Sequence, residues 1–484
     1  MLSKNPREYS IRLIMFSGTC KKETGTQHAK LIQTLLTASE NQKKHGGVTY
    51  RTVSIASDGE AKRGDALVHL TMNSTLSSDS PIYEQLKGLK FMNFLVGPDD
   101  ITADKDFKHV FKRQRNLMMR NKGIVIEGFC ITPSILHIHL QSNGVSSFRL
   151  RALLNLNDRQ DVVLGYSLLK EIWSLPAAPV GSDPAFVRAR RALYIYGQFA
   201  RNLMTPYICV DLNLDEQLIQ LSTAAHLVLY LYSDNLARTK FMPTQSYIDI
   251  MLMVKNVYFC IAKFKIDTLH GTFYIILLGT DCLELFFGLV RTSVSPDNNV
   301  DTTQLGSCAS GLTEVVVILA HHPEWDRPPR WLKLPVISKE SGEITAKADH
   351  INPASWRGDI EVSKVNLQTC WILGHQRAVE IIPEACVAFE HLGSTPGVDI
   401  LSPLGDILVN IRDADDKYDC SEIADMYAGS SEAPFTDSSE PVADASALST
   451  ACNIPYTHEG DMEDAIAEEV PRSTTITSDI VING

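Results

Sequence analysis

Apolar runs alternate with amphipathic stretches along the first hundred residues. Segments 11–16 (IRLIMF) and 50–57 (YRTVSIAS) end at turn signals and are typical of strands. Segment 28–38 places its apolar residues on one helical face, and a second helix is predicted at 66–70. A further strand is predicted over 91–96 (FMNFLV), closed by a Gly-Pro pair. The order strand, helix, strand, helix, strand predicts an α/β fold with parallel neighbouring strands.

From Asp161 to about Phe264 the pattern predicts helices alone. One helix is expected to begin at Pro184, where proline is tolerated, and another after Pro243. A third begins after Asn213, a good cap, with Glu216 placed three residues later as in a capping box.

The α/β pattern is expected to resume after this helical stretch. Segment 273–279 (FYIILLG) is strand-like, and 281–291 (DCLELFFGLVR) has one apolar helical face. Segment 312–319 continues as a helix, which the proline-rich stretch 323–335 ends.

This pattern predicts five parts of the chain. The five parts are a first part of the α/β core at 1–148, a helical insertion at 149–272, a final part of the core at 273–335, an α/β extension at 336–410 and a disordered tail at 411–484. GDIEV (358–362) and ILVNI (407–411) are expected to form two added strands.

Charge separates the tail from the rest of the chain. The net charge of the 484 residues is -12, but residues 411–484 hold 17 acidic and 3 basic residues. The remainder holds 42 basic and 40 acidic residues, so it is nearly neutral. The overall acidity therefore says nothing about what the folded part binds, and the tail has the composition of a disordered segment.

Cysteine spacing and hydropathy bear on the compartment. The ten cysteines are never closer than 16 positions, so no Cys-x-x-Cys pair exists, and they are interpreted as reduced thiols of an intracellular protein. We expect neither a signal peptide nor a membrane span. Nucleotide-binding loops and the α/β-hydrolase elbow are also missing, which weakens those classes of function.

Two acidic residues stand where an α/β fold places functional groups. Asp58 follows a predicted strand, and Glu284 lies in the first turn of a predicted helix. Carboxylates are the ligands that Mg²⁺ prefers, and two or three of them can hold two ions against a phosphodiester. Spacing alone favours a structural interpretation, because Asp58-Gly59 is a good turn pair and Asp281 with Glu284 has the spacing of a helix cap.

Segment 105–122 (KDFKHVFKRQRNLMMRNK) carries seven Lys or Arg residues and one Asp. Lys105, Lys108, Lys112 and Arg115 fall near one helical stripe, so the segment can form a basic ridge along a phosphate backbone. The alternative, a solvated helix face, is slightly favoured from this stretch alone.

Two histidine pairs are interpreted as structural, because no Cys or acid stands at metal-ligand spacing from them. They are His137 with His139, on alternate positions of a possible strand, and the doublet at 321–322.

Taken together, three segments resemble the catalytic core of P-element-like and hAT-like DNA transposases. VSIASDGEAKRG (53–64) resembles the strand-to-turn segment with the second catalytic aspartate, and DFKHVFKRQRN (106–116) matches Asp-x-x-His-x-x-Lys-x-x-Arg-Asn. LLGTDCLELFFGLVRTSVSPDNNVD (277–301) is similar to the late helix with the final catalytic glutamate. Segments 278–291 (LGTDCLELFFGLVR) and 311–329 (GLTEVVVILAHHPEWDRPP) also resemble copies common in mushroom-forming fungi.

This resemblance implies an RNase H-like mixed sheet interrupted by an all-helical insertion. It implies that Asp58 and Glu284 are the catalytic, metal-binding acids, with Mg²⁺ or Mn²⁺ as cofactor. It also implies a nuclear protein that binds DNA, can form homo-oligomers and does not bind membranes. The implied DNA-binding residues are Lys108, His109, Lys112, Arg113, Arg115 and Asn116.

The chain departs from the family at its amino end. In the family, the first catalytic aspartate and two further strands precede the strand that corresponds to 11–16, and this chain has no counterpart of them. The family's site-specific DNA-binding domain has no counterpart there either. We therefore expect a truncated, catalytically defective protein. Asp99 and Asp100, which follow 91–96, are candidates to replace the missing ligand. If an upstream exon supplies the missing strands, the chain belongs to a Mg²⁺-dependent strand-transfer enzyme. Two alternatives stay open: a non-catalytic DNA- or protein-binding helical interaction protein, and a fragment that does not fold alone.

Overall fold

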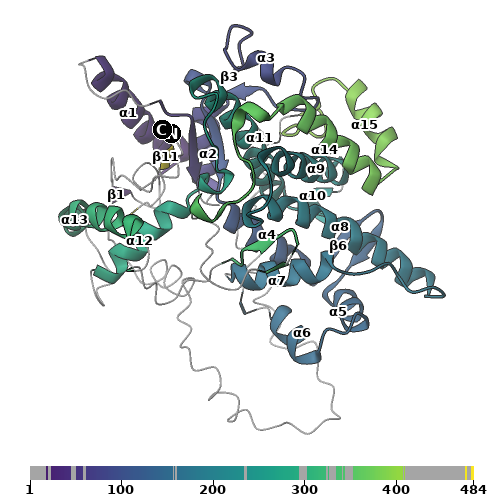
Figure 1. Ribbon diagram of the computed structural model, residues 1–484. Helices are drawn as coiled ribbons and strands as arrows, with labels where there is room; N and C mark the ends of the chain where they lie inside the picture. The colour runs from purple at the N-terminus through teal and green to yellow at the C-terminus, as the bar shows by residue number, and fades with distance from the viewer. Residues whose placement is uncertain are drawn as a thin grey trace. The chain divides into compact units, whose positions relative to one another are not determined.

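Helices make up most of the described residues in the computed structural model, and the strands form small mixed sheets (Figure 1). All described residues belong to one compact unit. The structure describes residues 18–19, 23–44, 51–57, 61–155, 157–158, 161–233, 237–293, 302–322, 325, 334–340, 342–343, 353–406, 408, 475–476 and 481–483.

The α-helices lie mostly in the middle of the chain. They are α1 (Gly25–Lys44), α2 (Ala61–Thr71), α3 (Tyr83–Leu86), α4 (Phe107–Met118), α5 (Pro133–Ser142), α6 (Ser147–Leu153), α7 (Val162–Trp173), α8 (Pro184–Ile208), α9 (Leu214–Tyr232), α10 (Ala237–Lys240), α11 (Thr244–Asp267), α12 (Asp281–Ser293), α13 (Thr302–His321), α14 (Leu367–Ile381) and α15 (Ala385–Ser394).

The strands are short. They are β1 (Gly18–Thr19), β2 (Ser54–Ser57), β3 (Ser74–Thr75), β4 (Leu95–Val96), β5 (Thr102–Lys105), β6 (Ile124–Ile126), β7 (Phe129–Ile131), β8 (Ile337–Ser338), β9 (Gly342–Glu343), β10 (Thr475–Ile476) and β11 (Val481–Asn483).

A buried parallel pair of strands, β2 and β5, supports the rest of the amino-terminal part. Ser54 is paired with Thr102 and Ser57 with Lys105, and every residue of both strands is buried. Strand β11 pairs antiparallel with the other edge of β2. The predicted strand over 50–57 and the predicted helices near 28–38 and 66–70 are therefore confirmed as β2, α1 and α2.

The strand prediction for 91–96 is wrong for most of its length. Only Leu95–Val96 forms a strand, which pairs with β3 and not with β2. Phe91 has a φ of 67°, and turn hydrogen bonds such as Met92 N–H to the Leu89 carbonyl bend the preceding backbone away from an extended path. The parallel neighbour of β2 is instead β5, whose sequence TADK carries almost no apolar signal.

The strand prediction for 273–279 is also wrong. Its centre is a 3₁₀ turn, Ile275–Leu277, and Phe273 donates its N–H to the Ile360 carbonyl. All residues from Phe273 to Leu278 are buried against helices. A continuous apolar run fits a buried irregular segment as well as a buried strand, so the pattern could not distinguish them.

Helices fill the stretch predicted to be helical, as α7 to α11. The predicted capping box of α9 is present, since Glu216 Oε2 accepts the Asn213 N–H at 2.8 Å. Helix α8 has a cap of its own, because Asp183 accepts the Ala185 N–H at 2.7 Å. His137 and His139 lie on helix α5, so the strand considered for them is wrong. His139 is buried, stacks on Phe186 and accepts a hydrogen bond from Arg190 Nε at 3.0 Å.

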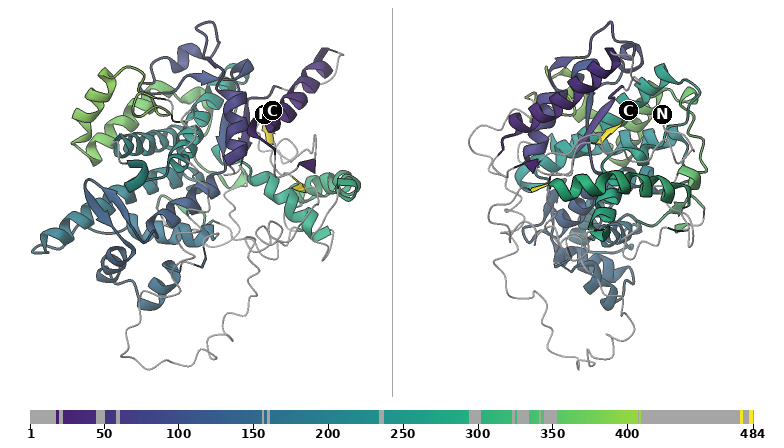
Figure 2. Two further views of the ribbon diagram at one scale, coloured as in Figure 1. Left: turned by 180° about the vertical axis from the view of Figure 1, so that it is seen from behind. Right: turned by 90° about the vertical axis from the view of Figure 1, so that its left-hand side faces the viewer.

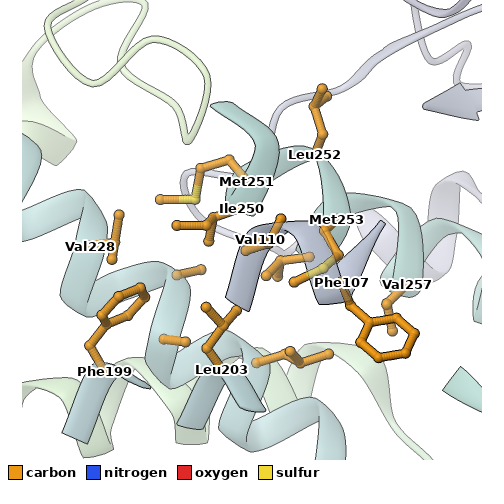
Figure 3. Close-up of a cluster of buried hydrophobic side chains, with 14 of the residues drawn as sticks. Phe107, Val110, Phe199, Leu203, Val228, Ile250, Met251, Leu252, Met253 and Val257 are labelled. Atoms are coloured by element: carbon orange, nitrogen blue, oxygen red, sulfur yellow. The ribbon is translucent and has the colours of Figure 1, made fainter. Parts of the chain in front are cut away.

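Helix α11 is the centre of the core. It is buried on all sides from Ser246 to Lys263 and contacts α4, α9 and β5. Figure 3 shows Phe107 and Val110 of α4 among side chains of α8, α9 and α11, including Phe199, Val228 and Met253. This packing fixes the position of α4 through its apolar side.

Helix α11 also carries charged groups into this core. Lys255 donates to Asn93 Oδ1 at 2.8 Å, and Lys263 donates to Thr102 Oγ1 at 3.2 Å. Because each buried ammonium has polar partners, the helix can be buried all round in spite of its charges. Burial lowers the pKa of Lys255 to about 7 and that of Lys263 to about 8.

Helices α12 and α13 pack on each other as a pair (Figures 1 and 2). Their apolar cluster, formed by Phe286, Val290, Leu305 and Leu312, is separate from the main core. Helix α12 contains the predicted apolar face of 281–291, and α13 contains the predicted helix 312–319. Among the described residues, hydrogen bonds at Gly279 and Thr280, just before α12, join the pair to the core.

In the extension after residue 336, the described segment 358–362 does not form the strand expected there. Segment 358–362 makes only a single bridge, Thr272 to Glu361, and 407–411 lies almost wholly outside the described residues. Helices α14 and α15 follow, and α14 packs along α9. The predicted strand at 11–16 is not among the described residues. The tail at 411–484, expected to be disordered, is described only at β10 and β11, which are strands. No helix in the described ranges is long and apolar enough to cross a membrane.

We predict that the free energy of unfolding rises with pH between about pH 7 and 8.5, below the range in which the raised pKa values of the Cys209, Cys260 and Cys370 thiols act in the opposite direction. In this window the unfolded chain keeps protons on Lys255 and Lys263 that the folded chain has released, so raising the pH favours folding. Lys255→Met should reduce the slope by roughly half. Urea unfolding at several pH values measures it, with Lys30→Met, an exposed lysine of α1, as control. An unchanged slope in Lys255→Met would contradict the assignment.

Candidate metal and DNA site

Two segments far apart in the sequence meet where strand β5 passes into helix α4. At that point Asp106 donates its N–H to the Ser57 carbonyl at 3.3 Å, which holds the start of α4 against the end of β2. The first turn of α12 lies at the same place, because Thr280 donates its hydroxyl to Asp106 Oδ2 at 2.7 Å across 174 positions of sequence. The site is therefore built from the ends of three elements.

Asp106 is the residue that joins these elements. It caps α4 by accepting the His109 N–H on Oδ1 at 2.9 Å, while Oδ2 accepts the Thr280 hydroxyl. Burial alone would raise the pKa of Asp106. The His109 imidazole, the Thr280 hydroxyl and the His109 N–H all stabilise the carboxylate and hold that pKa well below its usual range. Asp106 is thus a buried anion that is present at any pH near neutrality.

Asp104 makes a second connection to the approach of α12. Its Oδ2 accepts the Gly279 N–H at 2.9 Å, and its Oδ1 accepts the Lys105 N–H at 2.9 Å. Gly279 has a φ of +89°, a backbone conformation that favours glycine, so the chain can turn there into α12. Burial raises the pKa of Asp104 to about 7, although the two N–H groups oppose this change. Two aspartates of one short stretch therefore anchor residues 279 and 280.

His109 and Glu284 face each other at this junction. The distance from His109 Nδ1 to Glu284 Oε1 is 3.9 Å, and that to Asp106 Oδ1 is 3.2 Å. The side chain of His109 is 27% exposed and that of Glu284 is 45% exposed, so solvent reaches the cluster from one side. One ligand atom from each of Asp106, His109 and Glu284 lies within 4.8 Å of the other two.

This arrangement fits one divalent cation. It supplies two carboxylates and one imidazole, which are ordinary metal ligands. The Nδ1 atom of His109 is buried and faces both carboxylates, at 3.2 Å from Asp106 Oδ1 and 3.9 Å from Glu284 Oε1. The cofactor expected from the sequence is therefore compatible with the residues present, with Glu284 as one of its ligands.

Behind the cluster lies a buried group of charges on α4, α11 and β5. Asp249 of α11 pairs with Arg113, and its Oδ1 lies 3.7 Å from Lys105 Nζ. Lys105 also donates to Ser57 Oγ at 3.0 Å. Lys105, which the sequence places on the basic stripe, is thus a buried residue of β5.

The predicted site residues fall into four groups, of which Arg115 alone forms the last. Asp58 lies outside the described residues. Glu284 and His109 are brought together, as described above. Lys108, Lys112, Arg113 and Asn116 lie with His109 on the partly exposed side of α4, opposite its buried apolar side.

Arg115 differs from the other predicted DNA-binding residues. It is 1% exposed, and its guanidinium donates to the carbonyls of Asp158, Leu153 and Asn155 at 2.7, 3.1 and 2.7 Å. It therefore fixes the segment after α6. A buried arginine with these partners has a structural role, whatever the remainder of α4 binds.

Asp99 and Asp100 do not reach the cluster. They precede β5, whereas Asp106 follows it, so the four residues of β5, about 13 Å of extended chain, separate them. Asp99 pairs with Arg51 at 3.1 Å, and Asp100 accepts the Ser80 hydroxyl at 2.6 Å. The expectation that they could replace a missing ligand depended on the strand at 91–96, which is not the neighbour of β2.

The sequence gave no functional role to Asp104, Asp106 or Thr280. Asp106 opens the segment that matches the transposase pattern, and its position three residues before His109 is a usable signal for a cap. Asp104 had no signal, because its role depends on the backbone of Gly279, a contact between distant segments.

Comparisons with known proteins give one solved structure to report. No protein-family model and no curated protein matches the chain. The chain is similar to the structure described as the Drosophila P element transposase strand transfer complex, with 16% sequence identity and a TM-score of 0.36. The similarity covers 63% of this chain, which in turn spans 66% of the length of that one.

We predict that Thr280→Val loosens the start of α12. The buried charged carboxylate of Asp106 loses a hydrogen bond, which should lower the free energy of local opening by about 2 kcal/mol. Amide hydrogen exchange in the first turn of α12 should then become roughly thirtyfold faster. Thr313→Val is the matched control, because the Thr313 hydroxyl donates only to the Ala309 carbonyl of its own helix. Equal exchange in the two variants would contradict the role of Thr280.

Proposed function

We propose that this chain is a transposase-like protein that binds DNA through a divalent cation held by His109 and Glu284. The observation that carries the proposal is the meeting of segments 106–116 and 277–301. These segments resemble transposase motifs separately, and their polar residues form one cluster. If the two segments serve one function, their polar residues are expected to form a common cluster. If each resemblance is accidental, no such cluster is expected.

The chemistry expected of this site is the neutralisation of a phosphate. A cation at the cluster would be held by Glu284 and His109 from the solvent side and by Asp106 from the buried side. It would supply a positive charge to which a DNA phosphate oxygen can bind. Lys108 and Lys112, on the same side of α4, would contact neighbouring phosphates.

We do not expect this cluster to support DNA cleavage. Two-metal phosphoryl transfer needs ions about 4 Å apart, with carboxylates that hold both of them. Asp106, His109 and Glu284 supply ligand atoms for one ion, and one of them, Asp106, also caps α4 and binds Thr280. Asp58 stays a predicted second ligand. The proposal is therefore cation-dependent DNA binding, in the nucleus, by a protein with weak or no strand-transfer activity.

The basic side of α4 can be tested by the salt dependence of DNA binding. Lys112→Ala should make the plot of log affinity against log salt concentration shallower by about 1, because one phosphate contact is lost. Titration of the full chain with labelled duplex DNA at several salt concentrations gives this slope. Lys240→Ala, an exposed lysine of α10, is the control. An equal change of slope in the control would mean that binding is not localised to α4.

The role of the cation can be tested at Glu284. Glu284→Gln keeps the size of the side chain and removes its charge, so the increase in DNA affinity caused by Mg²⁺ or Mn²⁺ should fall at least tenfold. Glu314→Gln, an exposed glutamate of α13, should leave that increase unchanged. DNA binding that no cation affects, in the wild type as in both variants, would contradict the proposal. It would favour the alternative of a non-catalytic interaction protein.

A further inference from the structure

Two histidines are enclosed where helix α14 packs on helix α9. The imidazole of His226, on α9, contacts that of His375, on α14, edge to face, with ring centroids 5.0 Å apart. The rings of Phe91, Trp371 and Phe389 surround His226, at centroid distances of 6.5, 4.7 and 5.7 Å. His226 is 1% exposed, and His375 is half-buried. The interface between the two helices therefore contains two titratable rings in an aromatic environment.

The hydrogen bonds of the two rings leave one nitrogen of each without a partner. His226 Nδ1 lies 2.8 Å from the Ser222 carbonyl oxygen, which can only accept, so Nδ1 carries the proton of the neutral ring. The Nε2 atoms of His226 and His375 are both buried and have no hydrogen-bond partner. An imidazolium has N–H donors at both nitrogens, so in either ring the Nε2–H would be buried without an acceptor. Protonation is therefore costly while α14 lies on α9.

Neighbouring charges oppose protonation as well. The groups whose charge acts on His226 are His375 and Lys90, and Lys90 also acts on His375. Lys90 is a cation and each histidine becomes one in acid, so all three repel an imidazolium. Burial first, and then these charges, lowers the pKa of His226 to about 3, and the same causes lower the pKa of His375.

The other titratable groups of the surrounding elements bring no compensating charge to the pair. Glu384, at the start of α15, pairs with Arg191 at 3.6 Å. Tyr230 of α9 and Tyr258 of α11 contact Phe389 and Trp371, and burial raises the pKa of both tyrosines, so they stay neutral. Burial likewise raises the pKa of the Cys370 thiol of α14 to about 12. Both histidines are therefore neutral as long as the interface is closed.

The same interface holds a segment of the amino-terminal part in place. Trp371 donates its indole N–H to the Lys90 carbonyl at 2.8 Å, and Ser222 donates its hydroxyl to the Trp371 carbonyl at 2.9 Å. After α15, the Ile400 N–H donates to the Phe91 carbonyl at 2.8 Å. Helix α14 therefore connects α9 to residues 90–91, and its position decides whether the aromatic rings between them are covered.

We infer that His226 and His375 form an acid-released latch, which holds α14 and α15 on α9 near neutral pH and lets them separate reversibly in mild acid. Separation would give both imidazoles access to water and would expose the rings of Phe91, Trp371 and Phe389. The docked state binds fewer protons than the separated state, so lowering the pH through about 6.5, the ordinary imidazole pKa, favours separation. None of these residues belongs to the candidate metal and DNA site, so this inference and the proposed function can fail separately.

The test is amide hydrogen exchange of the full chain at pH 7.5 and 5.0, with each rate divided by that of an unstructured peptide at the same pH. Because the docked pKa of His226 is about 3, this residue alone should favour the separated state roughly thirtyfold more at pH 5.0 than at pH 7.5. Protection of α14 should therefore fall by at least about thirtyfold and should return at pH 7.5. At pH 5.0, α14 should exchange at least about tenfold faster than α8, because only part of the chain opens.

Variants separate the latch from a general effect of acid. His226→Phe combined with His375→Phe keeps two aromatic rings in the interface and removes both titrations, so protection of α14 should change less than about threefold between the two pH values. His375→Phe alone, at the half-buried position, should give a smaller pH effect than the wild type. His391→Phe removes an exposed imidazole of α15 and should leave the wild-type effect unchanged.

Three results would overturn the inference. The first is wild-type protection of α14 that does not depend on pH. The second is a pH effect that persists undiminished in both His375→Phe and the double variant. The third is equal exchange of α14 and α8 at pH 5.0, which would show that acid unfolds the chain as a whole.

Discussion

The buried carboxylate of Asp106 is the interaction on which the candidate site depends. It is held as an anion at the end of β5, where it caps α4 and binds the hydroxyl of Thr280. Thr280 is joined to the core by this hydrogen bond and by the buried residues just before it, since Leu277 and Leu278 belong to the main core. The position of Glu284 relative to His109 follows from this one carboxylate and from the neighbouring contact of Asp104 with Gly279.

The helical core makes such a buried anion possible. Helix α11 packs against β5 and α4, and it supplies polar partners as well as apolar surface. Asn256 accepts a hydrogen bond from Thr102 at 2.6 Å, and Asp249 pairs with Arg113. A polar strand such as β5 can therefore be buried on both sides, because its charged and polar side chains are matched by groups of the neighbouring elements.

The sequence predicted those elements that depend on contacts between residues close together in the sequence, and it failed for those that depend on distant residues. The helices from Val162 to Asp267 were predictable, since their apolar period and their caps are local signals. Strand β5 was not, because its four residues are mostly polar and are buried only through partners distant in sequence. The segment 273–279 was wrongly predicted as a strand for the opposite reason. Its residues are almost all apolar, and they are buried without belonging to a sheet.

The candidate site, like the fold, was predictable only in part. Glu284 and His109 were found through motifs, which predict that residues share a function but not how they meet. Asp104, Asp106 and Thr280 were missed as site residues, because their importance lies in hydrogen bonds across more than 170 positions. Asp99 and Asp100 were misplaced by an incorrect choice of neighbouring strand.

The central claim is that the start of α4 and the first turn of α12 together bind one divalent cation. Anomalous diffraction from crystals of the full chain grown with Mn²⁺ tests it most directly. A single strong anomalous peak about 2.1 Å from both His109 Nδ1 and a Glu284 carboxylate oxygen is the predicted result. Well-ordered His109 and Glu284 side chains without such a peak, or with Mn²⁺ bound only elsewhere, would contradict it.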